Sequence, residues 1–254
     1  MTGLDWPDRI VELSDRLVTE LVPPPTDGPG ICSRCRTWND AEPEPECSNC
    51  AEVRSLLGAE PLRISAVSLY RKPSILRDWL TQYKGRLDDV DPFVPAYRDI
   101  VAAMLARFHK EHGNLLQRRL GGYDRVLIVP STSRPPPHPL ESLVAATWTS
   151  TPVLRALKRG TGDLGFRKPA KDGYVVTEPT ATNRRVLIVD DVYTTGSRLN
   201  SAAYALRDAG FEIAGAFVIA RRVNVDFDAR AAEMWNRQSA KAFRWDTSPV
   251  VATP

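Results

Sequence analysis

The amino-acid sequence predicts an α/β protein built on a mostly parallel sheet with helices on both faces. Residues 126–129 and 186–189 are two runs made only of apolar side chains, as expected for strands that are buried on both sides. Segments with helical spacing of apolar residues lie between and around them, and this alternation favours parallel strands. In such sheets ligands bind beyond the carboxyl ends of the strands, and polar residues follow both runs.

The elements before the first apolar run follow from local patterns. Residues 5–21 place their aliphatic side chains along one face and predict an amphipathic helix. Three consecutive prolines make residues 23–30 a stiff linker. Residues 64–70 alternate as a strand, and residues 74–83 and 95–120 show helical spacing.

The elements after the first apolar run complete the predicted sheet. We expect a helix over residues 141–148, a strand over 152–157 and the last core strand over 212–220. Residues 229–235 have the spacing of one more helix. The basic loop over residues 160–173 could close over a bound anion, and it could equally be a solvated surface loop.

The second apolar run leads into a pattern suited to a phosphate. It ends in two adjacent acids, Asp190 and Asp191, and a helix begins a few residues later. The free N–H groups at a helix N-terminus favour an anion, glycine permits close approach, and hydroxyl groups add donors. The turn that offers these groups consists of Thr194, Thr195, Gly196 and Ser197. Carboxylates cannot face a phosphate favourably, but they can bind a sugar diol or a hard cation.

The four cysteines of the chain form a second motif. Cys32, Cys35, Cys47 and Cys50 are arranged as two C-x₂-C pairs separated by eleven residues. Such pairs bind Zn²⁺ tetrahedrally, and four protein ligands leave no open position, so the ion would be structural. Two disulfides are the alternative, which a reducing compartment disfavours. The intervening segment is too polar to form a core, so a metal would hold it together.

Composition excludes several classes of protein. The chain of 254 residues has a formal net charge of only +3, so no global field marks a nucleic-acid binder. The longest apolar runs are far shorter than the ~18 residues that a membrane helix needs. The N-terminus lacks the basic region of a signal peptide, so we expect a cytoplasmic protein with no membrane segment.

The motif around the acid pair closely resembles the phosphoribosyl pyrophosphate (PRPP) binding motif of type I phosphoribosyltransferases. Together with an N-terminal four-cysteine finger, the chain resembles the ComF (competence protein F) family. This resemblance implies a type I phosphoribosyltransferase-like sheet, a small zinc-ribbon-like finger, and Mg²⁺ bound with PRPP. It also implies five segments: an N-terminal helix (1–22), a linker (23–30), the finger (31–60), the phosphoribosyltransferase-like domain (61–224) and a C-terminal tail (225–254).

The resemblance also assigns roles to residues. Asp190 and Asp191 would engage the ribose hydroxyls and support catalysis. The 5′-phosphate would bind at Tyr193, Thr194, Thr195, Gly196 and Ser197. The pyrophosphate would bind at Ser131, Thr132, Ser133 and Arg134.

Two departures from the family pattern keep two functions open. Thr194 stands where 6-oxopurine transferases carry a carboxylate, and the segment from Arg134 to His138 lacks the arginine-rich run of ComF-like chains. The first function is an enzyme that transfers phosphoribosyl from PRPP to an unidentified small-molecule acceptor and releases pyrophosphate. The second is a non-catalytic sensor of PRPP or nucleotides, or an accessory protein of DNA uptake, whose finger docks a protein or DNA partner. The sequence leaves the oligomeric state open.

Overall fold

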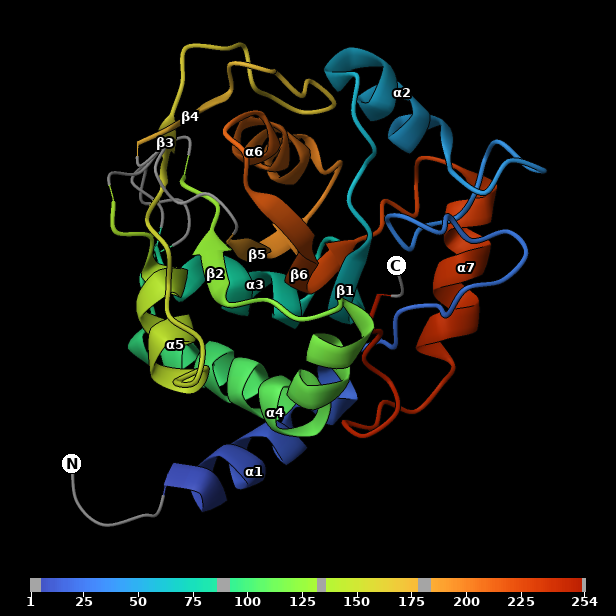
Figure 1. The fold of residues 1–254 in the computed structure, drawn as a ribbon. Coiled ribbons are helices and arrows are strands. Elements are labelled where there is room, and N and C mark those ends of the chain that lie inside the picture. Colours follow the sequence, from blue (N-terminus) through green and yellow to red (C-terminus); the bar gives the residue numbers. More distant parts are fainter. Residues whose placement is uncertain (1–5, 86–91, 132–135, 178–183, 253–254) are drawn as a thin grey trace.

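The computed structural model of the protein describes residues 6–85, 92–131, 136–177 and 184–252. Four strands form the main sheet in the order β1-β6-β5-β2, and all neighbours are parallel (Figure 1). Their bounds are Ile64–Tyr70 for β1, Arg125–Ile128 for β2, Arg185–Tyr193 for β5 and Glu212–Arg222 for β6. The predicted α/β class with a parallel sheet is confirmed.

Helices cover both faces of the sheet (Figure 1). The lower face in Figure 1 carries α3 (Ile75–Gln82), α4 (Pro95–Arg119) and α5 (Pro139–Thr147), and the upper face carries α2 (Ser48–Leu57) and α6 (Ser197–Asp208). Because α2 belongs to the finger, the finger lies on the same face as the helix that follows the acid pair.

The alternation of side chains along β5 divides the core in two. Leu187 and Val189 pack into one apolar cluster with residues of α3, α4 and α5. Val186 and Ile188 pack into the other with residues of α6. All four cysteines belong to that second cluster, so the finger is part of the main core and not an appended module.

A small second sheet corrects one prediction. Residues 152–157 do not form a strand. Val153 makes a single parallel bridge to Val126, and β3 (Leu157–Arg159) pairs antiparallel with β4 (Tyr174–Val176). The backbone of Val126 donates to Pro152 and accepts from Leu154, at 3.1 and 2.8 Å. Pro152 has no N–H to donate, so this segment cannot add a further bond to β2 at that position.

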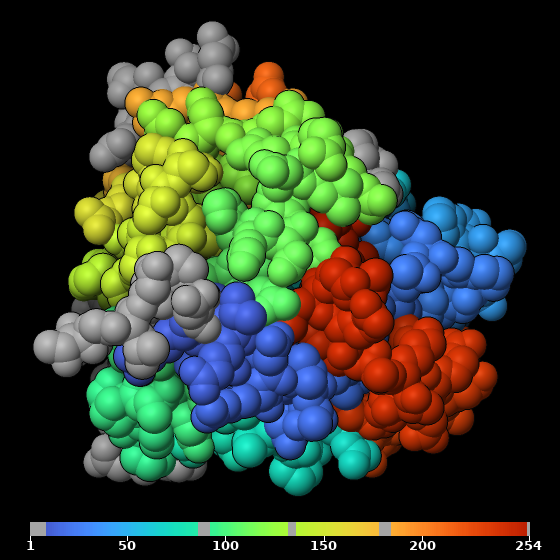
Figure 2. Space-filling model, turned by 90° about the horizontal axis from the view of Figure 1, so that it is seen from below, coloured from blue at the N-terminus to red at the C-terminus, as the bar shows by residue number. Residues whose placement is uncertain are grey.

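The two ends of the chain pack around α4. Helix α1 (Trp6–Arg16) and the C-terminal segment lie side by side across its outer surface (Figure 2). The Nε1 of Trp245 donates to the backbone carbonyl of Ser14 at 3.0 Å, and its own carbonyl lies 2.6 Å from Nε2 of His112. Within the segment 225–254, the helix predicted over residues 229–235 is present as α7 (Ala229–Ser239), and aromatic residues that follow it are buried. No helix of the described ranges has the length and apolar character needed to cross a membrane.

Candidate active site and metal centre

Strand β5 leads into the turn that the sequence singled out. The strand is longer than the predicted 186–189 and runs through both acids to Tyr193. Gly196 has a φ of +80° and caps the N-terminus of α6, a conformation that glycine adopts without strain. The hydroxyls of Thr195 and Ser197 lie 3.1 Å apart. We refer to residues 194–197 as the 194–197 turn.

A cavity of about 460 Å³ lies above this turn. Its walls include the acid pair, Asp190 and Asp191, and every residue of the 194–197 turn. Lys84 and Arg222 lie on the same walls. The structure therefore brings the predicted sugar-binding acids and the predicted phosphate-binding turn around one space, at the carboxyl end of a parallel strand.

The two acids are almost fully buried and have different partners. Asp191 forms an ion pair with Lys84 and accepts a hydrogen bond from the Tyr83 hydroxyl at 3.1 Å. Asp190 lies 3.8 Å from the Nη2 of Arg198, and its Oδ1 accepts from the backbone N–H of Asp191 at 3.0 Å. Each carboxylate thus faces a cation from a different helical region.

The surroundings move the two pKa values apart. Burial raises the pKa of Asp190 to about 6, and the charge of Asp191 adds to this effect while Arg198 opposes it. Burial acts in the same direction on Asp191, but the Lys84 ammonium outweighs it, with help from His138 and Arg198. The net effect of these neighbours, with the Lys84 ammonium foremost, is to hold the pKa of the Asp191 carboxyl well below its usual range. At neutral pH both acids are therefore ionised, Asp190 with the smaller margin.

Tyr193 points away from the cavity. Its side chain is 1% exposed and belongs to the apolar cluster that contains the cysteines. A Cβ at position 196 would overlap its ring, so the ring lies directly beneath Gly196. The structure places Tyr193 as a support of the turn, whereas the sequence placed it among the phosphate-binding residues.

Of the predicted pyrophosphate residues, the structure describes Ser131, which follows β2. Ser131 lines a neighbouring cavity of about 510 Å³, together with His138 and Arg159. Thr132, Ser133 and Arg134 lie outside the described residues. The carbonyl of Pro130, one residue before Ser131, accepts hydrogen bonds from Arg198 at 3.3 Å and from the Tyr174 hydroxyl at 3.1 Å.

The basic loop over residues 160–173 lies against the turn, with its cations directed elsewhere. Arg167 forms an ion pair with Glu52 of α2 at 2.8 Å, and Lys168 pairs with Asp163 at 3.2 Å. The loop contacts the turn through its backbone, since the N–H of Arg167 donates to the hydroxyl of Thr195 at 3.3 Å. Leu164, Gly165 and Phe166 of the same loop line the cavity.

Sequence reasoning missed Tyr83, Lys84 and Arg198 as parts of the site. Tyr83 and Lys84 follow α3, more than a hundred positions before the acids, and nothing local connects them. Arg198 carried a usable signal. A cation in the first turn of a helix opposes the helix dipole, so its presence at the start of α6 indicates an anionic partner, here Asp190.

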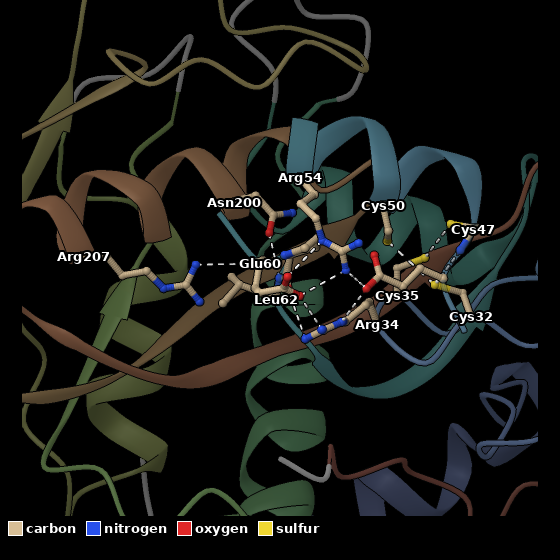
Figure 3. Close-up of polar contacts among 12 residues, drawn as sticks. Cys32, Arg34, Cys35, Cys47, Cys50, Arg54, Glu60, Leu62, Asn200 and Arg207 are labelled. Carbon is tan, nitrogen blue, oxygen red and sulfur yellow. Dashed lines mark hydrogen bonds and ion pairs between the residues drawn. The ribbon is translucent and has the colours of Figure 1, made fainter. Parts of the chain in front are cut away.

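The four cysteines form one compact cluster (Figure 3). All are free and buried, and their sulfur atoms lie within 4.8 Å of one another. Cys32 and Cys50 are 3.8 Å apart, and Cys35 and Cys47 are 3.7 Å apart, between Sγ atoms. Four thiolates about 2.3 Å from a tetrahedral ion would be separated by about 3.8 Å. The cluster therefore has the donors and the size to bind a metal ion.

Comparison with known proteins gives one partial match in sequence. No family model matches the chain. An adenine phosphoribosyltransferase of Saccharopolyspora erythraea is 40% identical over 81 residues, covering 25% of this chain and 44% of that protein. The chain thus matches less than half of this curated relative's length.

Comparison with solved structures finds low similarity to three phosphoribosyltransferases. Adenine phosphoribosyltransferase from Leishmania tarentolae has a TM-score of 0.34 and 13% identity, covering 60% of this chain and 90% of that chain. Orotate phosphoribosyltransferase from Aeropyrum pernix has a TM-score of 0.30 and 20% identity, covering 57% and 68%. A phosphoribosyltransferase from Corynebacterium diphtheriae has a TM-score of 0.35 and 18% identity, covering 73% and 90%. The finer resemblance to the ComF family stays a prediction.

Proposed function

We propose that the protein binds PRPP and transfers its phosphoribosyl group to a nucleobase-like acceptor, with release of pyrophosphate. The observation that carries this proposal is the shared cavity. One space of about 460 Å³ is bordered by a hydroxyl-bearing turn at a helix N-terminus and by two ionised carboxylates. A phosphate at one end and a sugar diol at the other match these groups. The sequence match to an adenine phosphoribosyltransferase supports the same assignment.

In this proposal the site works through position and charge. The bond from C1 of the ribose to pyrophosphate breaks, and a bond from C1 to a nitrogen of the acceptor forms. The 194–197 turn would hold the 5′-phosphate, and Asp190 and Asp191 would orient the ribose and stabilise positive charge on the ring. Ser131, Thr132, Ser133 and Arg134 would contact the pyrophosphate. Mg²⁺ bound with PRPP would supply positive charge near the leaving group.

We further propose that the four-cysteine cluster holds one structural Zn²⁺. Its support is a set of four buried thiols at the spacing of tetrahedral ligands. Metal analysis of the purified protein should find about one zinc per chain. A metal-free protein with two intact disulfides would contradict this assignment.

The acceptor is proposed to differ from hypoxanthine and guanine. Thr194, which lines the cavity, cannot act as the base that 6-oxopurine transferases use at this position. General-base help typically contributes about 10²–10⁴-fold to the rate. Turnover of either 6-oxopurine with PRPP should therefore be negligible in a steady-state assay at saturating Mg²⁺, whereas rapid nucleotide formation would restore a role in purine salvage.

A pyrophosphate-release assay tests the proposed activity. The protein, PRPP and Mg²⁺ are incubated with a panel of acceptors that begins with adenine and orotate, because these bases occur in the names of the similar proteins. Acceptor-dependent release of pyrophosphate supports the transferase. Tight PRPP binding without release for any acceptor would favour the sensor that the sequence left open.

A further inference from the structure

Three consecutive carbonyl groups of the 194–197 turn are each held by a different side chain. The carbonyl of Thr194 accepts a hydrogen bond from Nη1 of Arg221 at 2.7 Å. The carbonyl of Thr195 accepts one from Nδ2 of Asn49 at 2.9 Å. The carbonyl of Gly196 accepts one from Nδ2 of Asn200, also at 2.9 Å.

These bonds fix the direction of the N–H groups in the same peptides. In a trans peptide the C=O and the N–H of the next residue point in opposite directions. The N–H groups of Thr195, Gly196 and Ser197 therefore point away from the three side chains. None of them donates a hydrogen bond to another described residue, and all three residues line the cavity. Holding the carbonyls thus pre-orients three donors for an anion.

Two of the three side chains connect the turn to the finger, residues 31–60, and the third contacts the chain just beyond it. Arg221 is 5% exposed, and its Nε donates to the carbonyl of Cys35 at 2.9 Å. Asn49 lies between Cys47 and Cys50 in the sequence, at the start of α2. The Oδ1 of Asn200 accepts from the N–H of Leu62, just beyond the finger, at 2.8 Å (Figure 3).

The Tyr193 ring, which lies beneath the turn, is also packed against the finger. The Tyr193 ring shares its apolar cluster with the four cysteines, and the Arg221 guanidinium lies over that ring, 4.9 Å from its centroid. Arg221 therefore connects a cysteine backbone, an aromatic support and the Thr194 carbonyl in one buried arrangement. Loss of order in the finger would release at least two of the three carbonyls.

We infer that Asn49 and Arg221 are positioning residues that couple metal binding in the finger to anion binding at the 194–197 turn. The segment between the cysteine pairs is polar, and a metal bound by all four thiols would hold it, together with the Cys35 carbonyl and Asn49. The inference rests on the proposed function in two respects: it takes the turn as a phosphate site and the four-cysteine cluster as a zinc site. Because coupling between two ligands is reciprocal, a phosphate ligand must raise the metal affinity by the factor by which the metal raises the phosphate affinity.

The first experiment measures ribose 5-phosphate affinity by titration calorimetry on the full-length, zinc-loaded protein. Asn49→Ala should lower this affinity about tenfold, the effect expected from losing the one hydrogen bond that orients the Thr195 carbonyl. The zinc content should stay at that of the wild type. Ser55→Ala is the matched control. Ser55 lies exposed on the same helix and does not line the cavity, so the ribose 5-phosphate affinity of this variant should stay within about twofold of the wild type. Equal losses in both variants would mean that general damage to α2 is responsible, and this would overturn the inference.

The second experiment measures zinc affinity by competition with a chromogenic chelator, with and without saturating ribose 5-phosphate. Zinc affinity in the wild type should rise when the ligand is present. The quantity compared is the ratio of the zinc affinity with ribose 5-phosphate to the zinc affinity without it. In the double variant Asn49→Ala/Arg221→Lys this ratio should fall toward one, because lysine cannot bridge the carbonyls of Cys35 and Thr194. An equal ratio in the variant and the wild type would contradict the assignment of these two residues.

Hydrogen exchange separates this inference from the proposed function. If the wild type does not bind ribose 5-phosphate, the turn is no phosphate site and the proposed function fails. The coupling itself can still be measured, because zinc removal should speed amide exchange in a peptide covering residues 194–197 more than in one covering residues 185–190 of β5. Exchange of both peptides unchanged by zinc removal would overturn the coupling.

Discussion

The two halves of the site meet at the end of β5 and are held in different ways. The 194–197 turn is fixed by hydrogen bonds from neutral and cationic side chains to its backbone carbonyls. The acid pair is held by cations, with Lys84 against Asp191 and Arg198 near Asp190. One half is shaped through its backbone and the other through charge.

Because the two halves are held differently, ligand binding should place different demands on each of them. The hydrogen bonds to the carbonyls direct the N–H donors of the turn at the cavity before a ligand binds. Binding there should therefore cost little conformational entropy of the protein. The acids are partly neutralised by Lys84 and Arg198, so a sugar diol or a cation must compete with these partners. We therefore expect the turn to respond to changes in the finger and the acid pair to respond to pH and to changes of charge.

The largest effect should come from adding one methyl group to the turn. Gly196 has a φ of +80° and a Cβ there would overlap the Tyr193 ring, whereas Gly210 has a φ of +86° with nothing within 4 Å of a Cβ. Gly210→Ala should cost only the backbone strain, about 1–2 kcal/mol. Gly196→Ala adds an overpacking term, for a total of about 2–5 kcal/mol. Denaturant unfolding of both variants measures the difference, and equal losses would show that the turn is not packed against Tyr193.

Single substitutions of the two acids should change stability in opposite directions. Asp190→Asn removes a buried charge whose ionisation is costly, so the free energy of unfolding at pH 7.5 should rise by about 1–3 kcal/mol. Asp191→Asn removes the partner of Lys84 and should lower it by about 3 kcal/mol. Urea unfolding at pH 7.5 is the measurement. If both substitutions changed the free energy of unfolding in the same direction, the two acids would not have the different environments described above.

The stabilisation by Asp190→Asn should depend on pH. The folded-state pKa of Asp190, about 6, lies above the ordinary value of 3.8 for this group. The native protein therefore holds this proton more tightly, and the contribution of Asp190 to stability is lost as the pH rises through about 6. The advantage of the variant should accordingly be present at pH 7.5 and vanish near pH 4. An advantage that stays constant over that range would show that Asp190 does not titrate there.

The smallest effect is expected at Arg167 in the basic loop. Its side chain is about two-fifths exposed and pairs with Glu52, an arrangement worth roughly 0–1 kcal/mol. Its bond to the Thr195 hydroxyl comes from the backbone and survives substitution. Arg167→Ala should therefore change PRPP affinity by less than about threefold in a calorimetric titration. A loss of a hundredfold or more would instead support a loop that closes over the pyrophosphate.

Local patterns predicted much of the site, and long-range packing supplied the rest. The acid pair and the turn were readable because the strand, the acids, the glycine and the helix are consecutive in the sequence. The contact of Lys84 with Asp191 spans 107 positions, that of Asn49 with Thr195 spans 146, and that of Arg221 with Cys35 spans 186. Only the folded sheet brings these residues together. The buried C-terminal segment escaped prediction for a related reason, because Phe243 and Trp245 follow no helical or strand periodicity.

The most direct test of the central claim is a calorimetric titration of PRPP and Mg²⁺ into the wild type and into the double variant Asp190→Asn/Asp191→Asn. If the acids hold the ribose in the cavity above the 194–197 turn, affinity should fall by about a hundredfold or more, since two charged hydrogen-bond acceptors are lost. Denaturant unfolding checks that the variant keeps its fold. Equal PRPP affinity in the two proteins would contradict the account, because it would remove the acid pair from the binding site.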